Sequence, residues 1–265
     1  MRSLVKCISS VYGVLMRNFA ADLHIHSLLS PCAAVEMTPR NIVWHAAAKK
    51  LDIIAITDHN ACDNVAAALM AAQEAGITVL PGMEVETREE AHFIVLFDKM
   101  RQLKEWERFV SVHRPKLKNN DEKFGAQFIV DEEDNFVGIK EELLLCSLSV
   151  NAGQLSAKVR ELEGLLIASH VDRPAYSILS QLGFIPPDLA LDAVEVSRRV
   201  KQNEAAIRIP GIGSYPVVTA SDAHTIEDFV SGPSVNFYLE QPTVAEIRQA
   251  LLGVNDRKIS EIVSS

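Results

Sequence analysis

Short apolar runs alternate along the chain with longer amphipathic or alanine-rich runs, which is the pattern of a sheet covered by helices. Buried strands are predicted for residues 18–27, 52–57, 77–87, 92–97, 165–170, 193–197, 216–224 and 234–239. Helices are predicted around residues 39–51, 64–76, 99–111, 139–150 and 154–163, with a last helix after residue 243. This order predicts an α/β fold with a mostly parallel sheet.

Cap residues support several of these helix boundaries. Thr38 followed by Pro39 is typical of an N-cap and a first-turn proline. Gly76 is placed to end the alanine-rich helix in a left-handed conformation. Thr243 and Glu246 have the spacing of a capping box for the last helix.

The middle of the chain departs from the simple alternation. Residues 113–125, HRPKLKNNDEKFG, are interpreted as a charged surface excursion, and residues 127–139, QFIVDEEDNFVGI, have the pattern of a hairpin with an acidic turn. We therefore expect one domain over residues 16–265 with a small helical and hairpin insertion around 98–163. Residues 1–15 precede a second methionine and are interpreted as an extension of doubtful role.

Composition and charge narrow the class of protein. The 265 residues carry a formal charge of −9 and the pI is near 5.4, so the mean field repels polyanions and nucleic acid is not the favoured partner. The four cysteines form no CxxC pair, which suits a reducing compartment. No run reaches the roughly eighteen apolar residues that a membrane-spanning helix needs. We expect a cytoplasmic protein without a membrane partner, and the oligomeric state stays open.

The first predicted strand carries a pair of histidines two positions apart. Side chains at i and i+2 of a strand share one face, so His24 and His26 can converge on a metal ion. The pair alone is a weak signal, because such pairs also arise by chance and are often only hydrogen-bonded or exposed to solvent.

Further polar residues follow other predicted strands at their carboxyl ends, where barrels and open α/β sheets place their sites. Taken singly, Asp58 or Asp222 could instead cap a helix or complete a turn. Taken together, five strands deliver candidate ligands, and capping does not explain this coincidence. The candidates are His24, His26, Asp58, His59, Glu84, His170, Asp222 and His224.

Three other histidines are weaker candidates. His92 begins a strand and could lie in the site or at the opposite rim, whereas His45 and His113 are expected on the surface. Imidazoles and carboxylates without paired thiolates indicate Zn, Mn or Fe, and the set is too large for one tetrahedral ion. Because a carboxylate such as Glu84 can bridge two ions, the sequence predicts a multinuclear hydrolytic centre, for which phosphate esters are the best-suited substrates.

Five motifs resemble those of the PHP (polymerase and histidinol phosphatase) family: DLHIHS, ITDHN, GMEVE, SHVDRP and SDAH, in that family's order over residues 16–239. The resemblance implies a distorted (β/α)7 TIM-like barrel with two or three divalent ions at the strand carboxyl ends. It also implies a first ion held by His24, His26, Glu84 and Asp222, a second near Glu84, His92 and His170, and another at His59 and His224.

One position departs from the family's pattern. Many relatives carry a further ligand seven or eight residues after the first histidine, where this chain has Pro31 and Cys32. Cys32 could ligate as a thiolate, Glu36 could reach in, or that ion binds weakly. The metal count therefore stays open between two and three.

The main hypothesis is a phosphoesterase that hydrolyses a small phosphorylated substrate with water activated at the metals. Arg173 is expected to hold the phosphate, with an ordinary surface arginine as the alternative, and Arg198 and Arg199 are weaker candidates. Asp58, His59 or a water is expected to supply the proton to the leaving group. The alternatives are a 3′–5′ exonuclease and a non-catalytic, metal-stabilised binding module.

Overall fold

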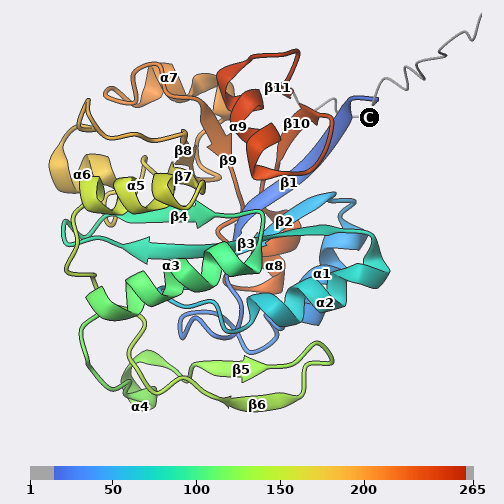
Figure 1. Cartoon of the computed structure of the whole chain (residues 1–265), viewed down its shortest axis with the longest axis vertical. Coiled ribbons are helices and arrows are strands. Elements are labelled where there is room, and N and C mark those ends of the chain that lie inside the picture. Colours follow the sequence, from blue (N-terminus) through green and yellow to red (C-terminus); the bar gives the residue numbers. More distant parts are fainter. Residues whose placement is uncertain (1–14, 261–265) are drawn as a thin grey trace, which may run out of the picture.

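The eight predicted strands, together with a short strand at Lys258–Ser260 that the sequence analysis does not predict, form one nine-stranded sheet in the computed structural model, which describes residues 15–260. Its order is β11-β10-β1-β2-β3-β4-β7-β8-β9 (Figure 1). The strands are β1 (Arg17–Ile25), β2 (Ile53–Ile56), β3 (Thr78–Glu86), β4 (His92–Leu96), β7 (Leu165–Ala168), β8 (Ala193–Val196), β9 (Val217–Thr219), β10 (Val235–Leu239) and β11 (Lys258–Ser260).

The sheet is mixed, so the expected parallel topology is only partly correct. β1, β2 and β3 run parallel, as do β7, β8 and β9, but β4 is antiparallel to both of its neighbours. Only residues 87–91 separate β3 from β4, and a connection that short joins antiparallel strands because a parallel pair needs a longer crossover. β10 also pairs antiparallel with β1. A mixed α/β fold is present, whereas the expected (β/α)7 barrel is not confirmed.

The sheet curls strongly into a half-barrel, and its two sides approach each other at the carboxyl end of β1. Ile25 forms an isolated parallel bridge with Ala223, which follows β9. The backbone N–H of His26 donates to the carbonyl of Ala223 at 3.0 Å. This contact brings the segment after β9 beside the histidine pair of β1.

The concave side of the sheet encloses an apolar core that helix α9 (Val244–Leu252) closes at one end. Val244 and Ile247 of α9 pack into this core, which also contains Leu23 of β1. The Arg248 guanidinium of α9 donates to Asp192, directly before β8, at 2.8 Å. The helix therefore covers the amino ends of the neighbouring strands and leaves their carboxyl ends for a site.

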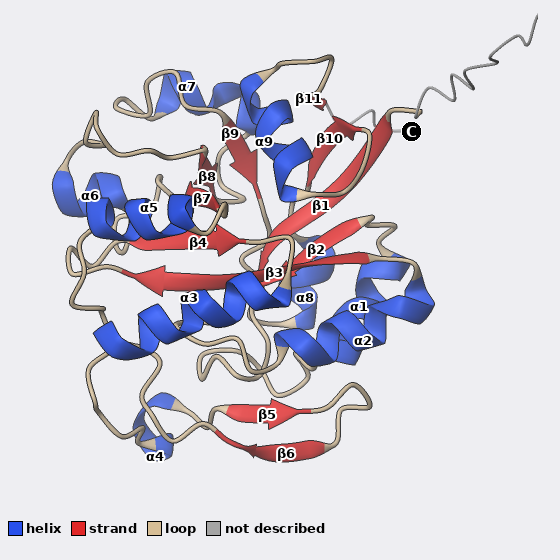
Figure 2. Cartoon of the chain, viewed as in Figure 1, coloured by secondary structure: helices blue, strands red, loops and turns tan. Residues whose placement is uncertain are grey.

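Helices cover the convex side of the sheet (Figure 2). They bury a second and larger apolar core, to which Trp106 and Phe97 contribute. The helices on this side and in the connections are α1 (Pro39–Ala48), α2 (Val65–Ala75), α3 (Met100–His113), α5 (Ala152–Glu161), α6 (Ile178–Leu182), α7 (Ala205–Arg208) and α8 (Ile226–Ser231), with a 3-10 turn at Gln202–Glu204.

Two of the three predicted helix caps are confirmed in full. The Thr38 side chain accepts the N–H of Asn41, and Gly76 adopts φ +67° at the end of α2. Thr243 also caps α9 by accepting the N–H of Glu246. The Glu246 carboxylate, however, accepts the N–H of Glu240 at 2.9 Å instead of closing a capping box.

The insertion contains α4 (Asp121–Phe124) and a separate hairpin of β5 (Phe128–Val130) and β6 (Phe136–Ile139), which lies apart from the main sheet at the lower edge of Figure 1. The predicted hairpin is confirmed. The helix predicted over 139–150 is wrong: the N–H groups of Leu143 and Leu144 donate to the Leu117 carbonyl and the Gln127 side chain, outside any helical pattern.

Two expectations concern the ends and the membrane. The proposed extension, residues 1–15, lies outside the described residues except for its last position. Within residues 15–260, no helix is long and apolar enough to cross a bilayer.

Candidate metal centre

A bulge near the carboxyl end of β1 turns two histidines toward the inside of the curled sheet. The register of β1 against β2 shifts by one residue between Asp22 and Ile25. Leu23 belongs to the inner core but Ile25 belongs to the outer one, so the alternation of faces changes at this bulge. His24 and His26 are both fully buried and face the same centre, as their spacing predicts.

Two carboxylates meet this histidine pair. The Nε2 atom of His24 lies 3.1 Å from Nε2 of His26 and 3.3 Å from a Glu84 oxygen. The same atom lies 3.3 Å from Oδ1 of Asp222, and Nε2 of His26 lies 3.4 Å from each carboxylate. Ligands about 2.1 Å from one ion lie roughly 3–3.5 Å apart, so these atoms have the spacing of a single coordination sphere.

The outward nitrogens of both rings are held by the protein. Nδ1 of His24 lies 2.9 Å from a Glu195 oxygen, and Nδ1 of His26 lies 3.0 Å from the Ser30 hydroxyl. Such contacts fix the orientation of a ligating imidazole and leave Nε2 free to bind an ion. Glu195 is 1% exposed and lies in β8.

Asp58 supports this arrangement from behind. Its two oxygens accept the Ser27 N–H at 2.7 Å, the Ser27 hydroxyl at 2.6 Å and the Ser30 hydroxyl at 2.7 Å. Burial raises the pKa of Asp58, although His26 and these serines oppose the rise. The carboxylate does not line the main pocket, so the geometry gives no support to the expectation that Asp58 protonates a leaving group.

Glu84 occupies the centre of the cluster, at the inner face of β3. One of its oxygens lies 3.1 Å from Nδ1 of His59, and the other lies 3.2 Å from Nδ1 of His92 and 3.6 Å from Nε2 of His170. Burial favours the neutral acid, but His92 and His24 outweigh it and hold the pKa of Glu84 well below its usual value. An ionised carboxylate with histidines on both sides can bridge two ions.

Two ligand candidates lie on strained backbone after strand ends. His170 has φ +30° and Asp222 has φ +48°, a region that residues with side chains rarely adopt. Asp222 is held further by Arg173, whose guanidinium contacts its Oδ2. His170 comes shortly after β7, and Asp222 comes shortly after β9.

His224 completes a histidine group on the other side of His26. Its ring stacks on the His26 ring at a centroid distance of 4.2 Å, and its Nδ1 lies 3.0 Å from the Asp222 carbonyl. Burial and the neighbouring His26 lower the pKa of His224 to about 3, which keeps the ring neutral. A neutral imidazole is the form that binds metals.

The described residues contain three groups whose ligand atoms lie within 4.8 Å of one another: His24, His26 and Glu84; His59, Glu84 and His92; and His26, His59 and His224. His45 and His113 belong to none of them. His45 packs edge-on against Trp44, and Nδ1 of His113 contacts the Phe109 carbonyl. Converging nitrogens and oxygens without thiolate pairs fit hard or borderline divalent ions.

The departure at Pro31 and Cys32 lies at the edge of the third group. A side-chain contact with Cys32 contributes to the raised pKa of His59, after the opposing effects of burial and His26. Glu36 is exposed and belongs to none of the three groups. Of the two replacements considered, only Cys32 therefore lies beside a candidate ligand.

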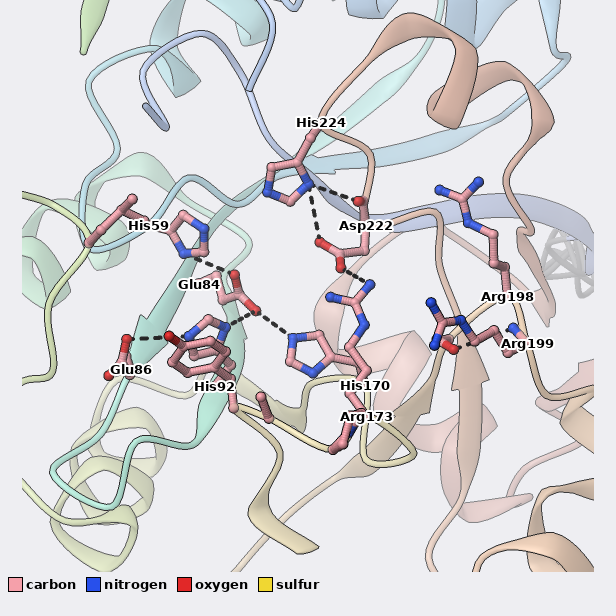
Figure 3. Close-up of a pocket in the computed structure, with 15 residues that line it drawn as sticks. His59, Glu84, Glu86, His92, His170, Arg173, Arg198, Arg199, Asp222 and His224 are labelled. Carbon is pink, nitrogen blue, oxygen red and sulfur yellow. Dashed lines mark hydrogen bonds and ion pairs between the residues drawn. The ribbon is translucent and has the colours of Figure 1, made fainter. Parts of the chain in front are cut away.

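The candidate ligands form one wall of an open pocket of about 840 Å³. Figure 3 shows His59, His92 and Glu86 on one side and Arg173, Arg198 and Arg199 on the other. Tyr176 also lines the pocket, and its ring stacks on His92 at 4.9 Å. All three arginines singled out from the sequence therefore line the same pocket as the candidate ligands.

Sequence reasoning missed Glu86 and Glu195. Glu86 lies 3.4 Å from Nε2 of His92 and accepts the Ser147 hydroxyl. Glu195 is the only charged residue of the predicted strand AVEVS. A charged side chain inside an apolar strand is the sequence pattern that could have indicated its role in the site.

The chain is similar to one family model and to several solved structures. The PHP domain model matches residues 22–183. A lesion-specific endonuclease from Pyrococcus furiosus has a similar structure, with a TM-score of 0.68 and 21% identity over 92% of this chain and 58% of that chain. A protein named as a metal-dependent phosphoesterase from Bifidobacterium adolescentis gives a TM-score of 0.53 and 19% identity over 77% of this chain and 87% of that one.

This chain thus spans about three fifths of the length of the endonuclease. No curated protein matches it. The structural likenesses show a shared fold, and the family match covers more than half of the chain and includes four of the five motifs. The chain therefore belongs to the PHP domain family.

Proposed function

We propose that this protein hydrolyses a phosphate ester at a cluster of two or three divalent ions, with Mn, Zn and Fe as the candidates. The observation that carries the proposal is the convergence of His24, His26, Glu84 and Asp222 at 3.1–3.4 Å, with Glu84 extending to further histidines. Bound divalent ions supply an activated water and stabilise the charge on phosphoryl oxygens.

The residues of this chain supply the remaining parts of the reaction. The Arg173 guanidinium lines the pocket beside Asp222 and is 40% exposed, so it is available to bind a phosphoryl oxygen. His59 lines the same pocket, whereas Asp58 does not, so we assign the protonation of the leaving oxygen to His59 in a two-ion centre, in which His59 holds no ion. Glu195 and Ser30 keep the histidine pair oriented throughout.

A nuclease is the second candidate. It is favoured by the row of arginines at the pocket and by the similarity to a lesion-specific endonuclease. The overall charge of −9 limits this candidate to substrates that contact the protein locally. A non-catalytic binding module, the third hypothesis, would keep the metals but release no phosphate.

Asp222→Asn tests the proposal directly. The amide keeps the size of the side chain but removes the charge from the first coordination sphere, so we expect phosphate release from p-nitrophenyl phosphate with Mn²⁺ to fall about a hundredfold or more. Asp188→Asn, at an exposed position outside the pocket, is the matched control and should keep the wild-type rate. Unchanged turnover in Asp222→Asn would remove this residue from the centre.

Metal content separates the hypotheses. Mass spectrometry of the Mn-reconstituted and desalted protein should give two or three equivalents, and fewer in Asp222→Asn. Retained metal without hydrolysis of any mono- or diester would favour the binding module over an enzyme.

A further inference from the structure

A second pocket, of about 530 Å³, lies beside the metal pocket and shares Arg173 and Arg199 with it. Its other polar lining residues include Asp172 and Arg208, and its apolar lining includes Leu179. None of its lining residues is a candidate metal ligand. The two arginines therefore stand between the metal centre and a separate cavity.

A carboxylate fixes the two loops that carry these arginines. Asp172 accepts the N–H of Ser197 at 2.7 Å and its hydroxyl at 2.6 Å, which ties the segment after β7 to the segment after β8. Both Asp172 oxygens are thereby occupied. The clamp holds Arg173 and Arg199 at the shared wall of a cavity whose lining carries three arginines and one aspartate.

The cations of this wall differ in how they are paired. Arg173 contacts Asp222, and Arg208 contacts Glu204 at 2.7 Å on the exposed side of α7. Within residues 15–260, Arg199 has no carboxylate within 4.0 Å. The exposed guanidinium of Arg199 borders both cavities and has no carboxylate partner there. It is therefore available to bind an anionic group of a ligand, such as a phosphate.

Exposed aromatic rings accompany the arginines. Tyr176 is 49% exposed and stacks on His92 with one face, so its other face is open to the metal pocket. Phe184 is 56% exposed and directly follows Gly183, which lines the second pocket. Cationic grooves with aromatic rings are how proteins bind single-stranded nucleic acids, since bases stack on the rings while guanidinium groups hold phosphates.

We propose that the second pocket binds a non-scissile phosphate of a single-stranded oligonucleotide whose scissile phosphate lies at the metal centre. This proposal rests on the proposed function and extends it to the substrate class. Arg199 and Arg208 hold the distal phosphate, and Arg173 lies between the two phosphates. The local cluster of arginines makes such a contact compatible with the acidic mean charge of the protein.

Arg208→Gln is the most informative variant, because Arg208 lines only the second pocket. KM is measured for a single-stranded deoxythymidine decamer and for p-nitrophenyl phosphate, which is too small to reach both pockets. We expect the decamer KM to rise about 3- to 10-fold relative to the p-nitrophenyl phosphate KM, and its salt slope to fall by about one. Arg101→Gln, which removes an exposed charge from α3, should leave both KM values unchanged.

A change at the paired glutamate should act in the opposite direction. Glu204→Gln releases Arg208 and removes a negative charge near the pocket, so the decamer KM should fall. Anisotropy of the labelled decamer on the Asp222→Asn protein, with and without Arg208→Gln, measures binding without turnover.

The outcomes distinguish this proposal from the one on which it rests. Absence of p-nitrophenyl phosphate and decamer hydrolysis would overturn the proposed function. Hydrolysis with equal decamer KM in wild type and Arg208→Gln would overturn the second subsite alone. A KM effect on fructose 1,6-bisphosphate but not on the decamer would replace the oligonucleotide by a small bisphosphorylated substrate.

Discussion

Glu195 links the histidine pair of β1 to the opposite part of the sheet. One of its oxygens lies 2.9 Å from Nδ1 of His24, and the other accepts the backbone N–H of His170 at 3.3 Å. A buried carboxylate that contacts a ligating imidazole increases its basicity and fixes its tautomer. Glu195 is therefore a positioning residue that acts on two candidate ligands at once.

Glu195→Gln should weaken metal binding while the protein stays folded. The amide preserves the size of the side chain but removes the charge behind His24, and loss of such a contact typically costs about 10- to 100-fold in metal affinity or activity. Competition with a chromogenic chelator measures the affinity. Glu74→Gln, an exposed position on α2, is the matched control, and equal affinities in the two variants would refute this role.

The sequence predicts most of the candidate ligands that lie together in the fold, because they occupy strand ends, where a polar residue interrupts an apolar run. The spacing of His24 and His26 predicts a shared face within one strand, and Glu84 interrupts an apolar run in another strand. The role of Glu195 is not predictable in this way. Its partners His24 and His170 lie 171 and 25 residues away in the chain, and local sequence patterns do not show which distant residues come together. The role of Asp58 was similarly set by serines that only the folded loop brings near it.

Among the structural elements, the expected insertion packs against residues 27–31, which follow the histidine pair of β1. The N–H of Phe128 in β5 donates to the Leu28 carbonyl at 3.1 Å. Asn64 donates to the Ser27 hydroxyl at 3.0 Å and to the Phe128 carbonyl at 3.1 Å. Gly125, with φ +96°, packs so closely on Pro31 that an added Cβ would overlap the Pro31 carbonyl oxygen.

Gly125→Ala should therefore disturb the centre from a distance. Overlap with a backbone atom and an unfavourable φ together cost about 2–3 kcal/mol, which lowers Tm by roughly 5–10 °C. We also expect fewer metal equivalents after desalting, because the loop of Ser30 and Cys32 shifts. Gly138→Ala, in β6 of the same insertion, places its Cβ in open space and should change neither quantity by much. Full metal retention in a destabilised Gly125→Ala would separate the insertion from the centre.

Sequence patterns predicted the elements better than their connections. Apolar runs and turn residues predict the strand at 92–97 and the hairpin, but the direction of β4 follows from the short loop before it. The sequence predicts a helix over 139–150, which the structure does not contain. The backbone groups of this segment pair instead with the rest of the insertion, a long-range choice that local periodicity does not reveal.

For the whole molecule, the buried cluster couples stability to both pH and metal. Burial of His92 opposes its protonation, but Glu84 outweighs this and raises the pKa to about 9 in the metal-free protein. The charged pair therefore stabilises the fold fully below the unfolded value of about 6.5 and loses its effect as pH rises through about 9. The pKa values of His24 and His26 are raised as well, despite burial, by the carboxylates around them.

Metals bind the neutral rings, so they replace these protons as the pH rises. We expect Mn²⁺ to raise Tm above that of the EDTA-treated protein by about 5–10 °C at pH 8.0 and by clearly less at pH 6.0, measured by differential scanning fluorimetry at fixed metal and ionic strength. Asp222→Asn should reduce the shift at both pH values, whereas Asp188→Asn should not. Equal shifts at pH 6.0 and 8.0 would mean that Mn²⁺ stabilises the protein without displacing protons from this cluster, and that the histidines do not form the centre.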